Sequence, residues 1–164
     1  MLLDAFALTR ERLPHALLMI AGREGNATGA LRTRVQELGL DQTVLFLGVR
    51  SDVPELLCAA DVFVFPSRWE GLPGGVLEAM ALEAPIVASD IGPVRETTGG
   101  EEAALLVPPE ASARLAESIL AVLGDPGAAA ERAYHARVRF LEHFTIDRIA
   151  DATVRFYERA LGRG

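Results

Sequence analysis

Short runs of consecutive apolar residues alternate along the chain with longer stretches in which apolar residues recur every three or four positions. A short uninterrupted run is typical of a strand buried on both faces, and the wider spacing is typical of a helix. The runs predict strands at 17–21, 44–47, 61–65, 85–88 and 103–107. The spaced stretches predict helices at 1–12, 28–38, 52–60, 74–83, 93–98, 112–123, 128–142 and 146–161.

Strands that alternate with helices predict a parallel sheet with right-handed crossovers and helices on both faces. We therefore expect a Rossmann-like α/β fold of about five strands. The length of 164 residues predicts a single domain, 1–164. Ligands of such sheets bind beyond the carboxyl ends of the strands. These ends are expected to share one rim, formed by Gly22, Gly48, Pro66, Asp90 and Pro108.

The stretch from 61 to 79 combines a strand, a loop and a helix start. The strand ends at Pro66, which has no N–H to donate to the sheet, and the helical spacing begins at Gly74. The first amides of a helix lack intrahelical partners, and the helix dipole adds partial positive charge there. Because Gly74 and Gly75 carry no side chain, an anion can approach these amides. The pattern predicts a phosphate site.

Two carboxylates bracket this predicted phosphate site. Glu70 lies in the loop, and Glu78 lies about one turn into the helix. A carboxylate would repel a phosphate that it touched, so the expected partners of both glutamates are neutral hydroxyls, such as those of a ribose or a sugar. Phosphate-binding amides flanked by two hydroxyl acceptors predict a sugar-nucleotide site.

Composition narrows the function further. The chain has 23 acidic and 16 basic residues and a net charge of −7, which argues against a nucleic-acid partner. Every basic residue is arginine, so a P-loop ending in Gly-Lys-Ser/Thr and a lysine Schiff base are both excluded. The sequence has no Asp-x-Asp motif and its histidines are scattered, so we expect no metal site.

The single cysteine, Cys58, excludes an internal disulfide and a cysteine-based zinc site, and it agrees with a reducing compartment. We interpret Cys58 and Trp69 as packing residues. The sequence has no uninterrupted apolar run of about 18 residues and does not begin with a signal-peptide pattern. These features predict a cytoplasmic protein, for which peripheral contact with a membrane stays open.

Four short segments follow one another: Pro66-Ser67, Glu70-Gly71, Leu-Glu-Ala-Met-Ala at 77–81 and Pro-Ile-Val-Ala at 85–88. Together they resemble the donor-binding core of the retaining glycosyltransferases with a GT-B fold, known as glycosyltransferase group 1 or family 4. The hallmark of this family is a pair of glutamates separated by seven residues. The resemblance implies the C-terminal half of a GT-B fold, with a nucleotide-sugar donor as substrate and no metal or other cofactor.

The resemblance also implies roles for individual residues. Glu78 would hold the ribose hydroxyls, and Glu70, the implied catalytic residue, would hold hydroxyls of the donor sugar. Val49 and Arg50 fall where the family has its base-recognition loop, although an ordinary surface loop explains them equally well. The remaining donor-binding residues are expected to be Gly71, Leu72, Pro73, Gly74, Gly75, Val76 and Leu77.

The same resemblance implies a missing part. In family members, a strand and a loop that contains arginine and lysine precede the first helix. An acceptor-binding domain precedes that strand. With the family's strand order 3-2-1-4-5-6, a missing first strand leaves a gap between 17–21 and 61–65. We therefore expect a fragment that holds the donor but transfers no sugar alone. The alternative is a non-catalytic module that binds a sugar nucleotide or docks a partner.

One departure from the family pattern concerns stability. Glu83 occupies the position at which the family usually has the glycine that ends the helix. We expect this substitution to affect stability more than binding.

Overall fold

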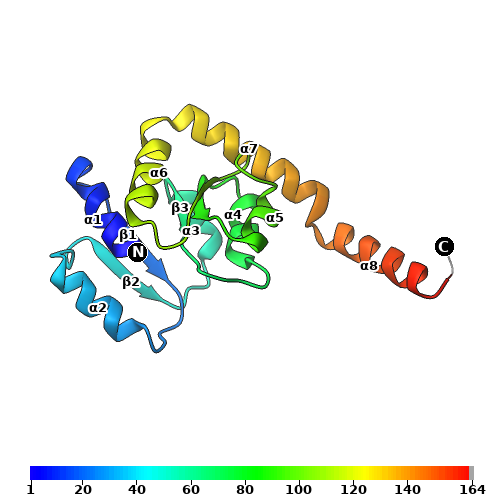
Figure 1. Ribbon diagram of the computed structural model, residues 1–164, viewed down its shortest axis with the longest axis horizontal. Coiled ribbons are helices and arrows are strands. Elements are labelled where there is room, and N and C mark those ends of the chain that lie inside the picture. The colour runs from blue at the N-terminus through cyan, green and yellow to red at the C-terminus, as the bar shows by residue number, and fades with distance from the viewer. Residues whose placement is uncertain (163–164) are drawn as a thin grey trace.

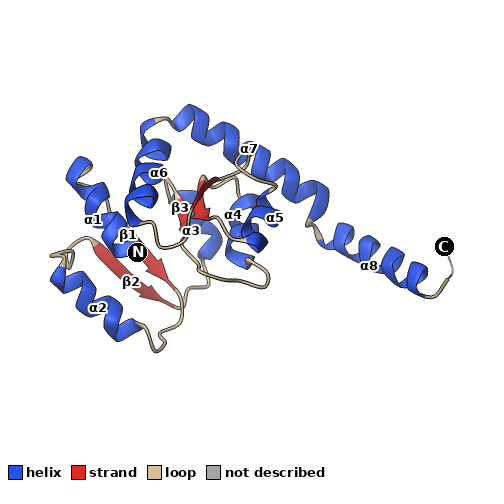
Figure 2. Cartoon of the chain, viewed as in Figure 1, coloured by secondary structure: helices blue, strands red, loops and turns tan. Residues whose placement is uncertain are grey.

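The five predicted strands are present, and they form two separate parallel sheets (Figures 1 and 2). In this computed structural model, which describes residues 1–162, β1 pairs only with β2, and β3, β4 and β5 pair in that order. The division falls between 17–21 and 61–65, as expected for a sheet without its central strand. The strands are β1 (Leu18–Ala21), β2 (Val44–Gly48), β3 (Phe63–Phe65), β4 (Ile86–Ser89) and β5 (Leu105–Val107).

Helices connect the strands and close the chain, and all of their bounds lie within two residues of the prediction. The described residues form α1 (Leu2–Arg12), α2 (Thr28–Glu37), α3 (Val53–Ala59), α4 (Gly74–Ala81), α5 (Gly92–Thr98), α6 (Ser112–Gly124), α7 (Pro126–His143) and α8 (Ile146–Ala160). Figure 1 shows α8 extending away from the rest of the molecule.

Successive side chains of β4 enter two different cores, because side chains alternate across a strand. Ile86 and Ala88 pack with residues of α3, α4, α5 and α7. Val87 packs on the opposite face with residues of α1, α6 and the start of α7. The three-stranded sheet is therefore covered by helices on both faces, as the uninterrupted apolar runs predict.

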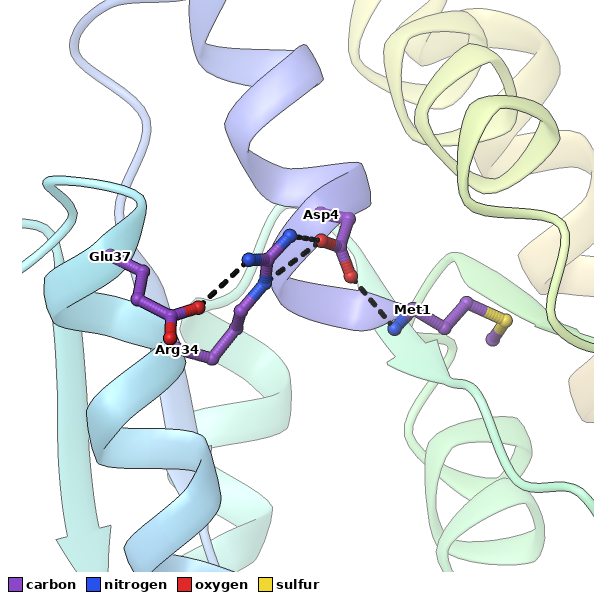
Figure 3. Close-up of polar contacts among 4 residues, drawn as sticks. All are labelled: Met1, Asp4, Arg34 and Glu37. Atoms are coloured by element: carbon purple, nitrogen blue, oxygen red, sulfur yellow. Dashed lines mark hydrogen bonds and ion pairs between the residues drawn. The ribbon is translucent and has the colours of Figure 1, made fainter.

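Helix α1 joins the two sheets. Ala5 belongs to the core formed with α6, whereas Leu3 and Phe6 belong to a third core with α2 and β2. At the α1–α2 contact, Arg34 donates hydrogen bonds to Asp4, which also accepts one from the amine of Met1 (Figure 3). This hydrogen bonding from Arg34 is the main reason why the pKa of Asp4 is lowered.

One local prediction in this region is wrong. Cys58, expected to be a packing residue, is exposed on α3, because the neighbouring Leu57 is the residue that this short helix turns into the core. Asp52 occupies the cap position before α3, but its carboxylate makes no hydrogen bond to the helix. Arg50 donates to both oxygens of that carboxylate instead, at 2.7 and 2.5 Å.

Candidate active site

The predicted site lies between β3 and α4. The strand ends at Phe65, Pro66 follows, and the loop reaches α4 through Pro73, which is fully buried before Gly74. The buried proline anchors the end of the loop against the core. The first turn of α4 is therefore held at the carboxyl end of β3, the place where ligands of parallel sheets bind.

The amides at the start of α4 are not all available to a ligand. Gly74 donates to the carbonyl of Leu72 at 2.9 Å, and Val76 donates to the carbonyl of Pro73 at 3.0 Å. In the described chain, the N–H of Gly75 lies between them without a hydrogen-bond partner. The predicted cradle of several amides thus reduces, in this conformation, to one unpaired donor at the positive end of the helix.

The two glycines have different surroundings. A Cβ atom at Gly75 would lie 3.3 Å from the ring of Phe63 and 3.7 Å from that of Phe65, so Gly75 allows α4 to approach β3 closely. A Cβ atom at Gly74 would meet nothing within 4 Å. A ligand can therefore approach Gly74, but not Gly75, from the side on which a Cβ atom would lie.

Glu70 is half-buried and is held by a local hydrogen bond. The hydroxyl of Ser67 lies 2.6 Å from Oε1 of Glu70 and 3.2 Å from the carbonyl of Trp69. A contact of 2.6 Å is within the range of hydrogen bonds from hydroxyls to carboxylates. Sequence reasoning did not assign Ser67 a role, because no sequence signal indicates a hydrogen bond between these two loop side chains.

Glu78 is exposed on α4 and lines a cleft of about 340 Å³ between α3 and α4. The other lining residues are Val53, Pro54, Leu57, Ala81 and Leu82. Among the predicted site residues, Glu78 is the one that lines this cleft. The cleft therefore combines an apolar wall with a single carboxylate. Its walls were not predicted, because they come from two helices that the sequence does not place together.

Three arginines near the strand ends are paired with carboxylates. The pairs are Arg50 with Asp52 after β2, Arg68 after β3 with Glu110 after β5, and Arg95 in α5 with Asp90 after β4. The contacts at Arg50 and Arg95 are 2.5 Å, and that at Arg68 is 3.6 Å. Hydrogen bonds from the arginines are the main reason why the pKa values of Asp52 and Asp90 are lowered.

The other predicted donor-binding residues differ in exposure. Val49 beside Arg50 is 76% exposed, and Gly71 and Leu72 are exposed in the loop. Val76 is fully buried and Leu77 packs against the core, so these two offer a ligand mainly their backbone. The expectation that Trp69 packs against the loop is wrong, because Trp69 is 81% exposed.

Within residues 1–162, no group of three or more histidine, cysteine, aspartate or glutamate side chains is placed to hold a metal ion. None of the helices described is both long and apolar enough to span a bilayer.

Comparison with known proteins identifies the family. Residues 1–125 match the family described as "Glycosyl transferases group 1". The chain belongs to this family. The match includes both sheets and the whole Glu70–Glu78 segment of this group 1 chain.

Its relatives are longer enzymes. The chain is 34% identical over 143 residues to the lipopolysaccharide core biosynthesis mannosyltransferase LpsB of Rhizobium meliloti, covering 82% of this chain and 41% of LpsB. It is 32% identical over 166 residues to the D-inositol 3-phosphate glycosyltransferase of Jonesia denitrificans, covering 96% of this chain and 39% of that enzyme. The group 1 chain thus spans about two fifths of the length of these two relatives.

Solved structures share the fold. The Anabaena protein Alr3699/HepE, crystallised with UDP and with UDP-glucose, superposes with a TM-score of 0.88 at 26% identity. The superposition covers 96% of this group 1 chain and 44% of HepE. The α/β architecture of the chain is accordingly that of one half of a GT-B glycosyltransferase.

Proposed function

We propose that the protein transfers a sugar from a nucleoside diphosphate sugar to an acceptor hydroxyl, with retention of configuration, and that this chain holds the donor. The observation that supports the proposal most is the similarity to HepE, which was crystallised with UDP and UDP-glucose and matches 96% of this chain. The match of residues 1–125 to the glycosyltransferase group 1 family supports the same class of reaction, the transfer of a sugar.

In this reaction the bond between the anomeric carbon and the diphosphate oxygen breaks, and the same carbon forms a bond to the acceptor oxygen. The nucleoside diphosphate leaves with the bonding electrons, and it takes up the proton of the acceptor hydroxyl. Negative charge therefore grows on the diphosphate, and donors directed at it lower the barrier. The unpaired N–H of Gly75, at the positive end of α4, is such a donor.

The two glutamates hold the two ends of the donor. Glu78 accepts hydrogen bonds from the ribose hydroxyls, and the apolar cleft beside it accommodates the flat nucleoside. Glu70 accepts hydrogen bonds from hydroxyls of the transferred sugar. Val49 and Arg50 contact the base from the end of β2, and Gly74 leaves space for the diphosphate between the two carboxylates.

A binding module without transfer is the second candidate. It is favoured by the three arginines near the strand ends, each of which already pairs with a carboxylate. Pairing already neutralises part of the charge of these three arginines, which makes them weaker counterparts for the leaving diphosphate. Donor binding with no release of nucleoside diphosphate would favour this candidate over the transferase.

Titration calorimetry with UDP on the complete gene product tests the proposed roles. Glu78→Ala removes a charged acceptor from the ribose and is expected to cost about 1.5–3 kcal/mol of binding free energy. Glu70→Ala is expected to leave the affinity for UDP unchanged and to reduce turnover, because its partner is the transferred sugar. Glu131→Ala, on the exposed side of α7, is the matched control.

Turnover is measured as release of the nucleoside diphosphate from uridine, guanosine and adenosine diphosphate hexoses. Absence of both binding and release with the whole panel would overturn the proposed function. An equal loss of UDP affinity in Glu70→Ala and Glu78→Ala would overturn the division of roles between the two glutamates.

A further inference from the structure

The loop between β3 and α4 contains a hydrogen bond that fixes the carboxylate of Glu70. Ser67 lies directly after Pro66, and its Oγ is 2.6 Å from Oε1 of Glu70, three residues further on. Both side chains are half-buried. The rigid φ of the preceding proline limits the freedom of the chain where Ser67 begins the loop.

The hydroxyl of Ser67 has two acceptors within reach but only one proton to donate. The carbonyl of Trp69 lies at 3.2 Å and is neutral, whereas the carboxylate of Glu70 lies at 2.6 Å and is charged. Hydrogen bonds to charged acceptors are shorter and stronger than those between neutral groups. The proton therefore goes to Glu70, and the Trp69 carbonyl is the weaker contact.

This bond occupies only one oxygen of the carboxylate. In residues 1–162 no other side chain or amide donates to Glu70, so its second oxygen, Oε2, remains available to a ligand. The side chain of Glu70 has three rotatable bonds, and without Ser67 nothing polar in the described chain would hold it in one rotamer.

We infer that Ser67 is the positioning residue that aims the free oxygen of Glu70 at a hydroxyl of the transferred sugar. The inference rests on the proposed function, in which Glu70 contacts that sugar. An unanchored carboxylate can still bind, but it samples unproductive rotamers. Misplacement of a substrate-holding group by about 1 Å can cost up to a hundredfold in rate. The loss is expected in kcat and in the sugar's contribution to affinity, and not in the affinity for UDP.

The test uses the complete gene product and the best donor from the panel of nucleoside diphosphate hexoses. Ser67→Ala is expected to lower kcat between about tenfold and a hundredfold and to leave the Kd of the free nucleoside diphosphate unchanged. Ser67→Ala should also weaken binding of the complete donor relative to binding of the free nucleoside diphosphate. Ser67→Thr keeps the hydroxyl and should restore most of the rate. Ser118→Ala, on α6, is the control for loss of a serine hydroxyl away from the site.

A double-mutant cycle on donor affinity distinguishes positioning of Glu70 by Ser67 from a general structural role of Ser67. In the Glu70→Ala background, Ser67→Ala should change donor affinity no further, because the residue that it positions is gone. Thermal unfolding of each variant accompanies the measurements. Equal turnover and equal affinity ratios in wild type and Ser67→Ala would overturn the inference. A parallel loss of UDP affinity and melting temperature, or an undiminished effect in the Glu70→Ala background, would also overturn it.

These outcomes are distinct from failure of the proposed function. If the wild-type protein binds and turns over none of the nucleotide sugars, the proposed function is wrong and the inference falls with it. If the wild type is active, only the behaviour of the Ser67 variants decides whether Ser67 positions Glu70.

Discussion

Two adjacent glycines at the start of α4 meet different surroundings, and this difference makes them separable by mutation. Alanine at 74 would place its Cβ in open space, and alanine at 75 would place it 3.3 Å from the ring of Phe63. Contacts this short force the neighbouring ring to move, and overpacking of this kind costs about 1–3 kcal/mol. Glycine also lowers helix stability relative to alanine by about 0.5–1 kcal/mol.

We therefore expect Gly74→Ala to be as stable as the wild type or slightly more stable, yet to bind UDP more weakly, since its methyl group occupies space proposed for the diphosphate. Gly75→Ala should be less stable than Gly74→Ala by about 1–2 kcal/mol, a difference measurable by urea unfolding. Unchanged UDP affinity in a stable Gly74→Ala variant would place the diphosphate elsewhere.

At the scale of single residues, the sequence predicted which residues lie at the candidate site better than it predicted what these residues contact. The glutamate pair and the glycines stand at the end of β3 and the start of α4, as their spacing predicted. The ring of Phe63 under Gly75 could not be predicted, because the contact depends on how closely a helix approaches a strand. Trp69 was wrongly expected to pack, since an apolar side chain in a loop gives no signal of its direction.

At the scale of single elements, the end of α4 contains a residue in an unfavourable conformation. Glu83 has a φ of +54°, in the left-handed region that residues with a Cβ avoid at a cost of about 1–2 kcal/mol. Its carboxylate is 3.8 Å from Nε of Arg137 on α7, and Nη1 of Arg137 donates to the carbonyl of Ala81 at the end of α4. Arg137 therefore caps the end of the helix and compensates only in part for the missing glycine.

A comparison of Glu83→Gly with Glu83→Ala separates backbone strain from charge, because both variants remove the carboxylate. The glycine variant should be more stable than the alanine variant by about 1 kcal/mol, after allowing for the greater entropy of glycine in the unfolded chain. The loss of the exposed ion pair itself should cost little. Urea unfolding that finds the two variants equally stable would show that the left-handed conformation is not strained. UDP affinity serves as the control and should not change.

Elements were more predictable than their assembly. Apolar runs and helical spacing place the strands and helices within a few residues, because each element has to bury one face or both. The division of the sheet followed from the family's strand order. The role of α1 could not be predicted, since the sequence does not show that its apolar residues serve two separate cores.

At the scale of the whole molecule, apolar and hydrogen-bonding groups remain uncovered. In the described sheets, β1 and β3 each have a neighbour on one side only, so each keeps a free edge. Helix α8 has no buried residue, and one of its faces is apolar. The exposed large apolar residues of this helix are Ile146, Ile149, Val154, Phe156 and Tyr157. An exposed apolar stripe of this kind marks a surface that associates.

The purified 164-residue chain is expected to self-associate, mainly through the apolar face of α8. The helix carries three acidic residues and three arginines, so its net charge is zero and the attraction is hydrophobic. Association should therefore persist at high salt, which weakens attraction between charges.

Sedimentation velocity at increasing protein concentration measures this self-association. Ile149→Ser combined with Phe156→Ser should shift the chain towards monomer. Asp151→Ser combined with Arg155→Ser, which changes the opposite face without altering net charge, should not. A monodisperse wild-type monomer, or equal dissociation by both pairs of substitutions, would contradict this prediction.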